Sequence, residues 1–136
     1  MKVKILYKQY LDGYGKDYKI GGIETYIYNL SLLLKENNFL VEIFQFSKEN
    51  FIVEKEEAKI IGVKSNKVKE LITEASKNAD YKNDILIFAT DFMIMKSKFL
   101  NTLAIQHGIA WDIPSLKPKS YIGNTCLLYT SDAADE

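Results

Sequence analysis

Two kinds of hydrophobic periodicity alternate along the chain, and this alternation limits the possible folds most strongly. Residues 23–34 carry apolar side chains three and four positions apart, which is the spacing of one helix face. Residues 84–89 form a nearly continuous apolar run, which is typical of a strand covered on both faces. Similar runs and a second helical pattern occupy other parts of the chain. The alternation predicts an α/β fold with a mostly parallel sheet and helices on both faces.

The expected elements follow in a definite order. A helix is expected to begin after Gly21-Gly22 and to end at Asn37-Asn38, because asparagine tolerates the left-handed conformation that ends helices. A mobile loop is expected at 9–19, and a second loop, with two prolines, at 109–123. The other expected elements are strands at 3–7, 39–46, 84–89 and 102–106, a hairpin at 51–53 and 59–63, a helix at 66–79 and a short helix at 91–99.

Composition predicts a single globular domain without a strong charge. The 136 residues are 47% hydrophobic, and 18 basic residues balance 18 acidic ones. A net charge of zero gives no general attraction to nucleic acid. We see neither a secretory signal nor an apolar run of about 20 residues, the length that spans a bilayer. With one cysteine and one histidine, neither a disulfide framework nor a zinc site is expected. These features predict a cytoplasmic protein, at most peripherally associated with the inner face of the plasma membrane.

The last eleven residues, 126–136, differ in composition from the chain before them. The ten residues from Cys126 to Asp135 match one reading frame of a sequencing-library transposon adapter. We therefore expect 126–136 to be a non-native tail and 1–125 to be a truncated domain. A natural, frayed terminus is the alternative.

The first candidate site is Gly21-Gly22-Ile23-Glu24, between the first strand and the first helix. Ligands of open α/β sheets bind beyond the carboxyl ends of the strands. A glycine pair lets a ligand approach the backbone, and a helix amino terminus offers N–H groups and partial positive charge to a phosphate. The pattern is neither Gly-x-Gly-x-x-Gly nor a P-loop. The alternative is a plain turn before a helix.

Further candidates follow the later strands. His107 ends a predicted central strand, where it could donate a hydrogen bond to a sugar hydroxyl or stabilise developing charge; the alternative is a structural histidine. Trp111 and Asp112 place an indole beside a carboxylate, which suits a sugar, although the indole could simply anchor a loop. Asp91 is a weaker candidate, because its role could be limited to capping the next helix. A nucleophilic triad is not expected, since Gly-x-Ser-x-Gly does not occur and His107 has no obvious serine partner.

Together, Gly21–Leu30 and Gln106–Pro114 resemble the amino-terminal half of family 4 glycosyltransferases. This family has the GT-B architecture, in which two Rossmann-like domains face a cleft. The resemblance covers about residues 1–123 and implies an incomplete Rossmann-like, acceptor-side domain whose carboxyl-terminal partner domain is absent. One departure is Asn37-Asn38-Phe39, where the family often has Gly-His. A second is the first loop, with Tyr10, Tyr14 and Tyr18, which is longer than a minimal one. It could be a lid that contacts the acceptor, or a flexible insertion.

The resemblance also implies roles for individual residues. Gly21 and Gly22 would lie against the donor diphosphate, and His107 would be catalytic, close to the donor sugar. The possible sugar or acceptor contacts are Glu24, Asp91, Trp111 and Asp112. The implied reaction is the retaining transfer of a hexose from a nucleoside-diphosphate sugar to a hydroxyl of a glycan or lipid-linked acceptor. Such reactions serve cell-surface polysaccharide or glycolipid synthesis and need no metal or further cofactor.

Two other functions stay open. The first is a non-catalytic, flavodoxin-like binding or interaction domain, in which both motifs are structural. The second is a Rossmann-type enzyme that modifies nucleotide sugars. The missing dinucleotide fingerprint and the absence of Tyr-x-x-x-Lys argue against the second.

Overall fold

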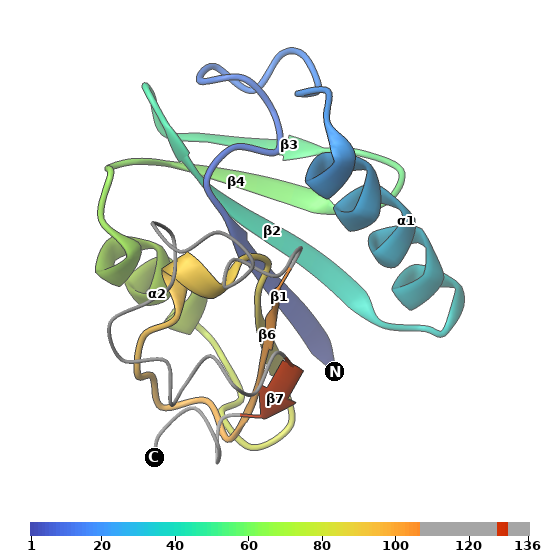
Figure 1. Cartoon of the computed structure of the whole chain (residues 1–136), viewed down its shortest axis with the longest axis vertical. Coiled ribbons are helices and arrows are strands. Elements are labelled where there is room, and N and C mark those ends of the chain that lie inside the picture. The colour runs from blue at the N-terminus through green and yellow to red at the C-terminus, as the bar shows by residue number, and fades with distance from the viewer. Residues whose placement is uncertain (107–127, 131–136) are drawn as a thin grey trace, which may run out of the picture.

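A computed structural model describes residues 1–106 and 128–130 and confirms the α/β fold. Its sheet has seven strands in the order β3-β4-β2-β1-β5-β6-β7 (Figure 1). The strands are β1 (Lys2–Tyr7), β2 (Leu40–Ser47), β3 (Phe51–Glu54), β4 (Lys59–Lys64), β5 (Ile85–Phe88), β6 (Asn101–Ile105) and β7 (Leu128–Thr130). The helices are α1 (Gly22–Glu36), α2 (Val68–Ser76) and the 3-10 turn η1 (Asp91–Met93).

The five central strands, β4-β2-β1-β5-β6, are parallel. In chain order they read 3-2-1-4-5, which is the order of a Rossmann-like sheet and differs from the flavodoxin order 2-1-3-4-5. The chain runs outward from β1 to β2 and β4, and then returns to add β5 on the other side of β1. The order therefore reverses between β1 and β5, and ligands of such sheets bind beyond the carboxyl ends of the strands at this point.

The two helices cover opposite faces of the sheet, as the sequence predicts (Figure 1). On one face, α1 packs Ile27 into a cluster that includes Val3 and Ile5 of β1. On the other, α2 packs Leu71 into a cluster that includes Leu6 of β1. Successive side chains of a strand point to opposite faces, so a strand buried on both faces reads as a continuous apolar run.

The end of α1 lies where the sequence predicts it. Asn37 caps the helix, and its side-chain amide donates to the Leu33 carbonyl at 2.8 Å. Asn38 follows with a φ of 69°, the left-handed conformation that asparagine tolerates. The chain then turns directly into β2.

The remaining elements compare with the expectations in different ways. The helix expected at 91–99 is only the turn η1, because the segment after it extends to bring Phe99 edge-on to Tyr81, at 5.3 Å between ring centroids. The expected hairpin is confirmed, with β3 antiparallel to β4. Strand β7, which no pattern predicted, pairs antiparallel with β6 and lies within the tail expected to be non-native. The loop expected at 109–123 lies outside the described residues.

Candidate functional site at the carboxyl edge of the sheet

The loop between β1 and α1 is held by the side chain of Gln45, which lies completely buried in β2. Its amide oxygen accepts from the backbone N–H of Tyr10 at 3.1 Å and of Leu11 at 2.7 Å. Its amide nitrogen donates to the carbonyls of Leu11 and Asp12 at 3.1 and 3.2 Å. The loop that the sequence predicts is therefore fixed at its base, with Tyr10 and Leu11 in the core.

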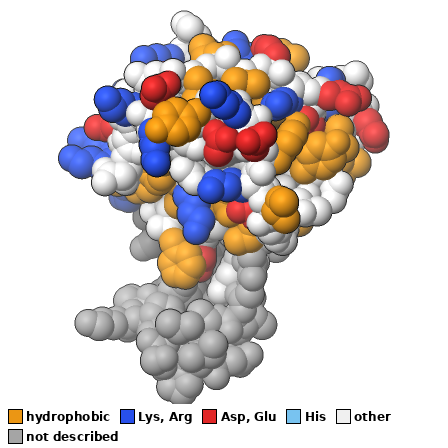
Figure 2. Space-filling model, turned by 90° about the horizontal axis from the view of Figure 1, so that it is seen from above, with side chains coloured by type: hydrophobic (Ala, Val, Ile, Leu, Met, Phe, Trp, Pro, Cys, Tyr) orange, Lys and Arg blue, Asp and Glu red, His pale blue; other side chains and the backbone are white. Residues whose placement is uncertain are grey.

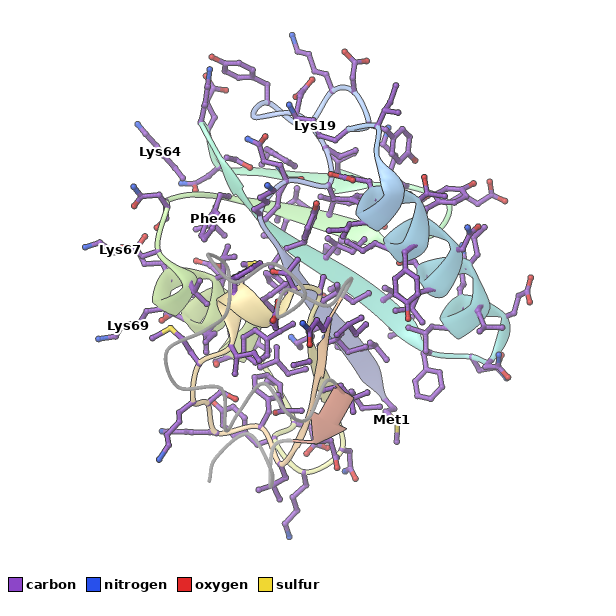
Figure 3. All side chains as sticks on the ribbon, viewed as in Figure 1. Met1, Lys19, Phe46, Lys64, Lys67 and Lys69 are labelled. Atoms are coloured by element: carbon purple, nitrogen blue, oxygen red, sulfur yellow. The ribbon has the colours of Figure 1, made fainter. Side chains whose placement is uncertain are left out.

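The outer part of the same loop is organised by Asp12. The carboxylate accepts from the backbone N–H groups of Lys16, Tyr14 and Asp17 at 2.8 to 3.0 Å. These hydrogen bonds, led by that of Lys16, hold the pKa of Asp12 below its usual value. The Lys19 N–H then donates to the Tyr10 carbonyl at 3.1 Å, which closes the loop. Figure 3 shows Lys19 close to the start of α1 and far from Met1.

The glycine pair lies at the amino terminus of α1. Gly21 caps the helix in an extended conformation, and its carbonyl accepts from both the N–H and the hydroxyl of Thr25, at 3.1 and 2.8 Å. The Glu24 carboxylate folds back over Gly21, whereas a Cβ added at Gly22 would meet no atom within 4 Å. The first N–H groups of a helix have no partner within it. The space around the Cβ position of Gly22 is therefore open, at a helix end whose first N–H groups can donate hydrogen bonds.

Glu24 is tied to the sheet by Tyr7, the last residue of β1. The Tyr7 hydroxyl, on a fully buried side chain, donates to Glu24 Oε2 at 2.8 Å. Burial, and then the hydrogen bond to Glu24, raise the pKa of Tyr7 above its ordinary value. The carboxylate is thus fixed at the point where the first strand meets the first helix.

A hollow of about 350 Å³ opens between the end of the loop and the first two turns of α1. Its lining residues are Tyr10, Tyr18, Lys19, Glu24, Thr25 and Tyr28. The rings of Tyr18 and Tyr28 lie 6.3 Å apart at 86° to one another. The lining of the hollow thus places Glu24 next to the rings of Tyr10, Tyr18 and Tyr28, which together form an aromatic, tyrosine wall.

The tyrosine wall rests on a buried carboxylate, Glu57. Tyr10 donates to Glu57 Oε2 at 2.6 Å, and Tyr18 donates to the same oxygen at 3.0 Å. Burial and these hydrogen bonds raise the pKa of Tyr18 to about 12, and they also raise that of Tyr10. The two hydrogen bonds to Glu57 keep the rings of Tyr10 and Tyr18 in place.

The structure brings some of the expected site residues together. Gly21, Gly22 and Glu24 are adjacent, and Asp91 begins η1 beyond the neighbouring strand β5, on the same edge of the sheet. The residue that caps η1 is Thr90, so the alternative of Asp91 as the cap is wrong. His107, Trp111 and Asp112 lie outside the described residues.

Sequence patterns missed the contributions of Tyr7, Lys19 and Tyr28, whereas Tyr18 belongs to the tyrosine-rich loop that the sequence singles out. No motif marks these residues, and the only signal is the high tyrosine content around the first loop. Their partners Glu57 and Glu24 lie 39 and 17 positions from the tyrosines that bind them. Only the folded chain places them side by side.

The surface around the site is mixed in character. Figure 2 views the molecule from above and shows lysine, acidic and apolar side chains interspersed. Two apolar side chains of the loops at this edge are strongly exposed, Ile20 at 99% and Phe92 at 88%. Within residues 1–106 and 128–130, no group of three or more histidine, cysteine, aspartate or glutamate residues could hold a metal ion. In the same described part of the chain, no helix has the length and apolar character needed to cross a bilayer.

Comparison with known proteins adds no relative. No protein-family model matches the chain, and neither a curated protein nor a solved structure matches it. The class that the structure defines is an α/β protein with a Rossmann-like, mostly parallel sheet.

Proposed function

We propose that the chain is the amino-terminal, acceptor-side domain of a retaining glycosyltransferase. In this reaction a hexose passes from a nucleoside-diphosphate sugar to a hydroxyl of a glycan or lipid-linked acceptor. The observation that carries the proposal is the open backbone at Gly22 at the start of α1, next to the position where the strand order reverses. The domain that binds the nucleotide would lie outside these 136 residues.

The geometry supports a diphosphate in front of Gly22 more strongly than in front of Gly21. The Glu24 carboxylate already lies over Gly21, and its charge repels a phosphate placed there. Gly22 faces open space, and the unpaired N–H groups and partial positive charge of the helix end favour an anion. Lys19, two residues before the pair, adds a nearby positive charge.

The chemistry of transfer is assigned to His107, which follows β6 in the sequence. An imidazole close to the donor sugar can hydrogen-bond to a hydroxyl and stabilise charge as the glycosidic bond breaks. Neither a metal ion nor a further cofactor takes part in the proposed reaction. The enzyme would work in the cytoplasm or at the inner face of the plasma membrane, in cell-surface polysaccharide or glycolipid synthesis.

The exposed side chains of Ile20 and Phe92 favour a second candidate, a non-catalytic interaction domain. Side chains so exposed and apolar suit a contact with another protein surface. The same side chains are equally compatible with a second domain across a cleft, so their exposure does not separate the two proposals. The proposals differ in chemistry. Only the transferase requires a nucleotide-sugar donor.

The test is a transfer assay on the chain joined to the coding sequence that follows residue 125 at its source locus. We expect hexose transfer from a nucleoside-diphosphate sugar with retained anomeric configuration, read by proton NMR of the product. His107→Ala should lower kcat by about a hundredfold, a typical loss for a residue that stabilises charge in the transition state. Full activity of this variant would rule out its role. No turnover with any of the common nucleotide sugars would favour the interaction domain.

A further inference from the structure

The hollow beside α1 has features that neither the glycine pair nor His107 uses. Its volume of about 350 Å³ lies near the lower end of the range for small-molecule sites, about 300–1,000 Å³. It offers room for a sugar ring. It also combines aromatic rings, a carboxylate and an ammonium group in one lining.

The aromatic wall is rigid before any ligand arrives. Tyr18 is fixed through its hydroxyl on Glu57, and its ring meets those of Tyr10 and Tyr28 edge-to-face at 5.7 and 6.3 Å. Tyr18 and Tyr28 nevertheless remain 43% and 36% exposed. Exposed, fixed tyrosine rings offer apolar contact area at a low cost in conformational entropy. The C–H groups on one face of a pyranose ring can pack on such a surface.

The polar groups suit the hydroxyls of the same ring. Tyr7 holds Oε2 of Glu24, while Oε1 points toward Gly21. An ionised carboxylate has about four acceptor sites, so Glu24 can accept further hydrogen bonds from a ligand. Lys19 lines the same hollow and has three N–H donors, which can reach hydroxyl oxygens.

We propose that this hollow is a pyranose subsite, with Glu24 and Lys19 hydrogen-bonded to hydroxyls and Tyr18 and Tyr28 packed on the ring. Tyr7 is the positioning residue, because its buried hydroxyl fixes the orientation of the Glu24 carboxylate. Glu24 and Lys19 carry opposite charges, so the lining as a whole suits an uncharged sugar. The assignment of the bound sugar as the acceptor rests on the proposed transferase function, whereas the binding of a sugar in the hollow does not.

The test is a titration of the 136-residue chain, labelled with ¹⁵N, with methyl hexopyranosides followed by amide NMR. We expect saturable shifts at Lys19, Glu24, Thr25 and Tyr28, with dissociation constants in the millimolar range. Glu24→Ala should weaken binding at least fivefold. The matched control is Tyr26→Ala, which removes an exposed tyrosine of α1 outside the hollow and should leave affinity unchanged.

Tyr7→Phe tests the positioning role. The variant should reduce the preference for a pyranoside over its monodeoxy analogues, a readout that a purely structural role would not change. Shifts absent with every pyranoside, or unaffected by Glu24→Ala, would overturn the proposal. Binding of sugars by the chain without transfer by the joined enzyme would sustain the subsite and refute the transferase. Transfer by the joined enzyme without NMR shifts at the residues of the hollow would refute the subsite and sustain the transferase.

Discussion

Replacing Gln45 by methionine should destabilise the protein strongly, although the two side chains are similar in size. The substitution leaves the buried N–H groups of Tyr10 and Leu11 without their acceptor. It also removes the donor to the Leu11 carbonyl. A buried polar group left unpaired costs about 1–3 kcal/mol, so two N–H groups alone predict roughly 2–6 kcal/mol. Part of this cost is offset by the apolar methionine, and we expect a net loss of about 3 kcal/mol.

The assay is urea unfolding followed by far-UV circular dichroism. A loss of about 3 kcal/mol is a large part of the 5–15 kcal/mol that stabilises a typical domain. The matched control is Gln9→Met, in the same loop but on a half-buried side chain, which should cost less than about 1 kcal/mol. Equal losses in the two variants would refute the conclusion that the Gln45 amide fixes the loop.

Three further predictions concern the stability of the fold. Tyrosine ionisation should leave the free energy of unfolding unchanged below pH 10 and should lower it from pH 10 to about 12, as measured by urea melts. The reason is that tyrosine in the unfolded chain ionises near pH 10, whereas Tyr18 in the folded chain ionises only near 12. Gly15→Ala should cost at least about 1 kcal/mol in the same melts, since Gly15 has a φ of 74°, whereas Gly22→Ala should be nearly neutral. Lys4→Met should cost about 3 kcal/mol by breaking the buried 3.0 Å pair with Glu42, and the double variant with Glu42→Leu should recover most of it. An equally unstable double variant would contradict that account.

The layers of the fold could be predicted because burial leaves a direct mark on the sequence. The apolar stripe of α1 and the continuous run of β5 follow from which faces are covered. The end of α1 at Asn37 and Asn38 follows from the conformational tolerance of a single residue type. The strand order was not predictable in the same way, because periodicity carries no information on which strands are neighbours.

The site was predicted only in part because its polar contacts are non-local. Gln45 fixes a loop that lies 34 positions earlier in the chain. Glu57 lies between the two strands of the expected hairpin, yet its side chain is buried beneath two tyrosines. Lys4 is buried and pairs with Glu42, and the apolar pattern of the two strands does not indicate a charged pair in the core. A polar or charged side chain is unusual at each of these buried positions, and only its hydrogen-bond or ion-pair partner explains why it lies there.

The central claim is that the open backbone at Gly22 receives the diphosphate of a nucleotide sugar. Calorimetric titration of the joined enzyme with the donor tests it most directly, by comparing Gly22→Val with Asn29→Val. Both variants place a β-branched residue on α1, but Asn29 is exposed further along the helix. A Cβ at Gly22 meets no protein atom within 4 Å, so the chain itself tolerates the change. We predict that Gly22→Val weakens donor binding about tenfold or more, the equivalent of one charge-assisted hydrogen bond, while Asn29→Val binds as the wild type does. Equal donor affinity in the two variants would contradict the claim.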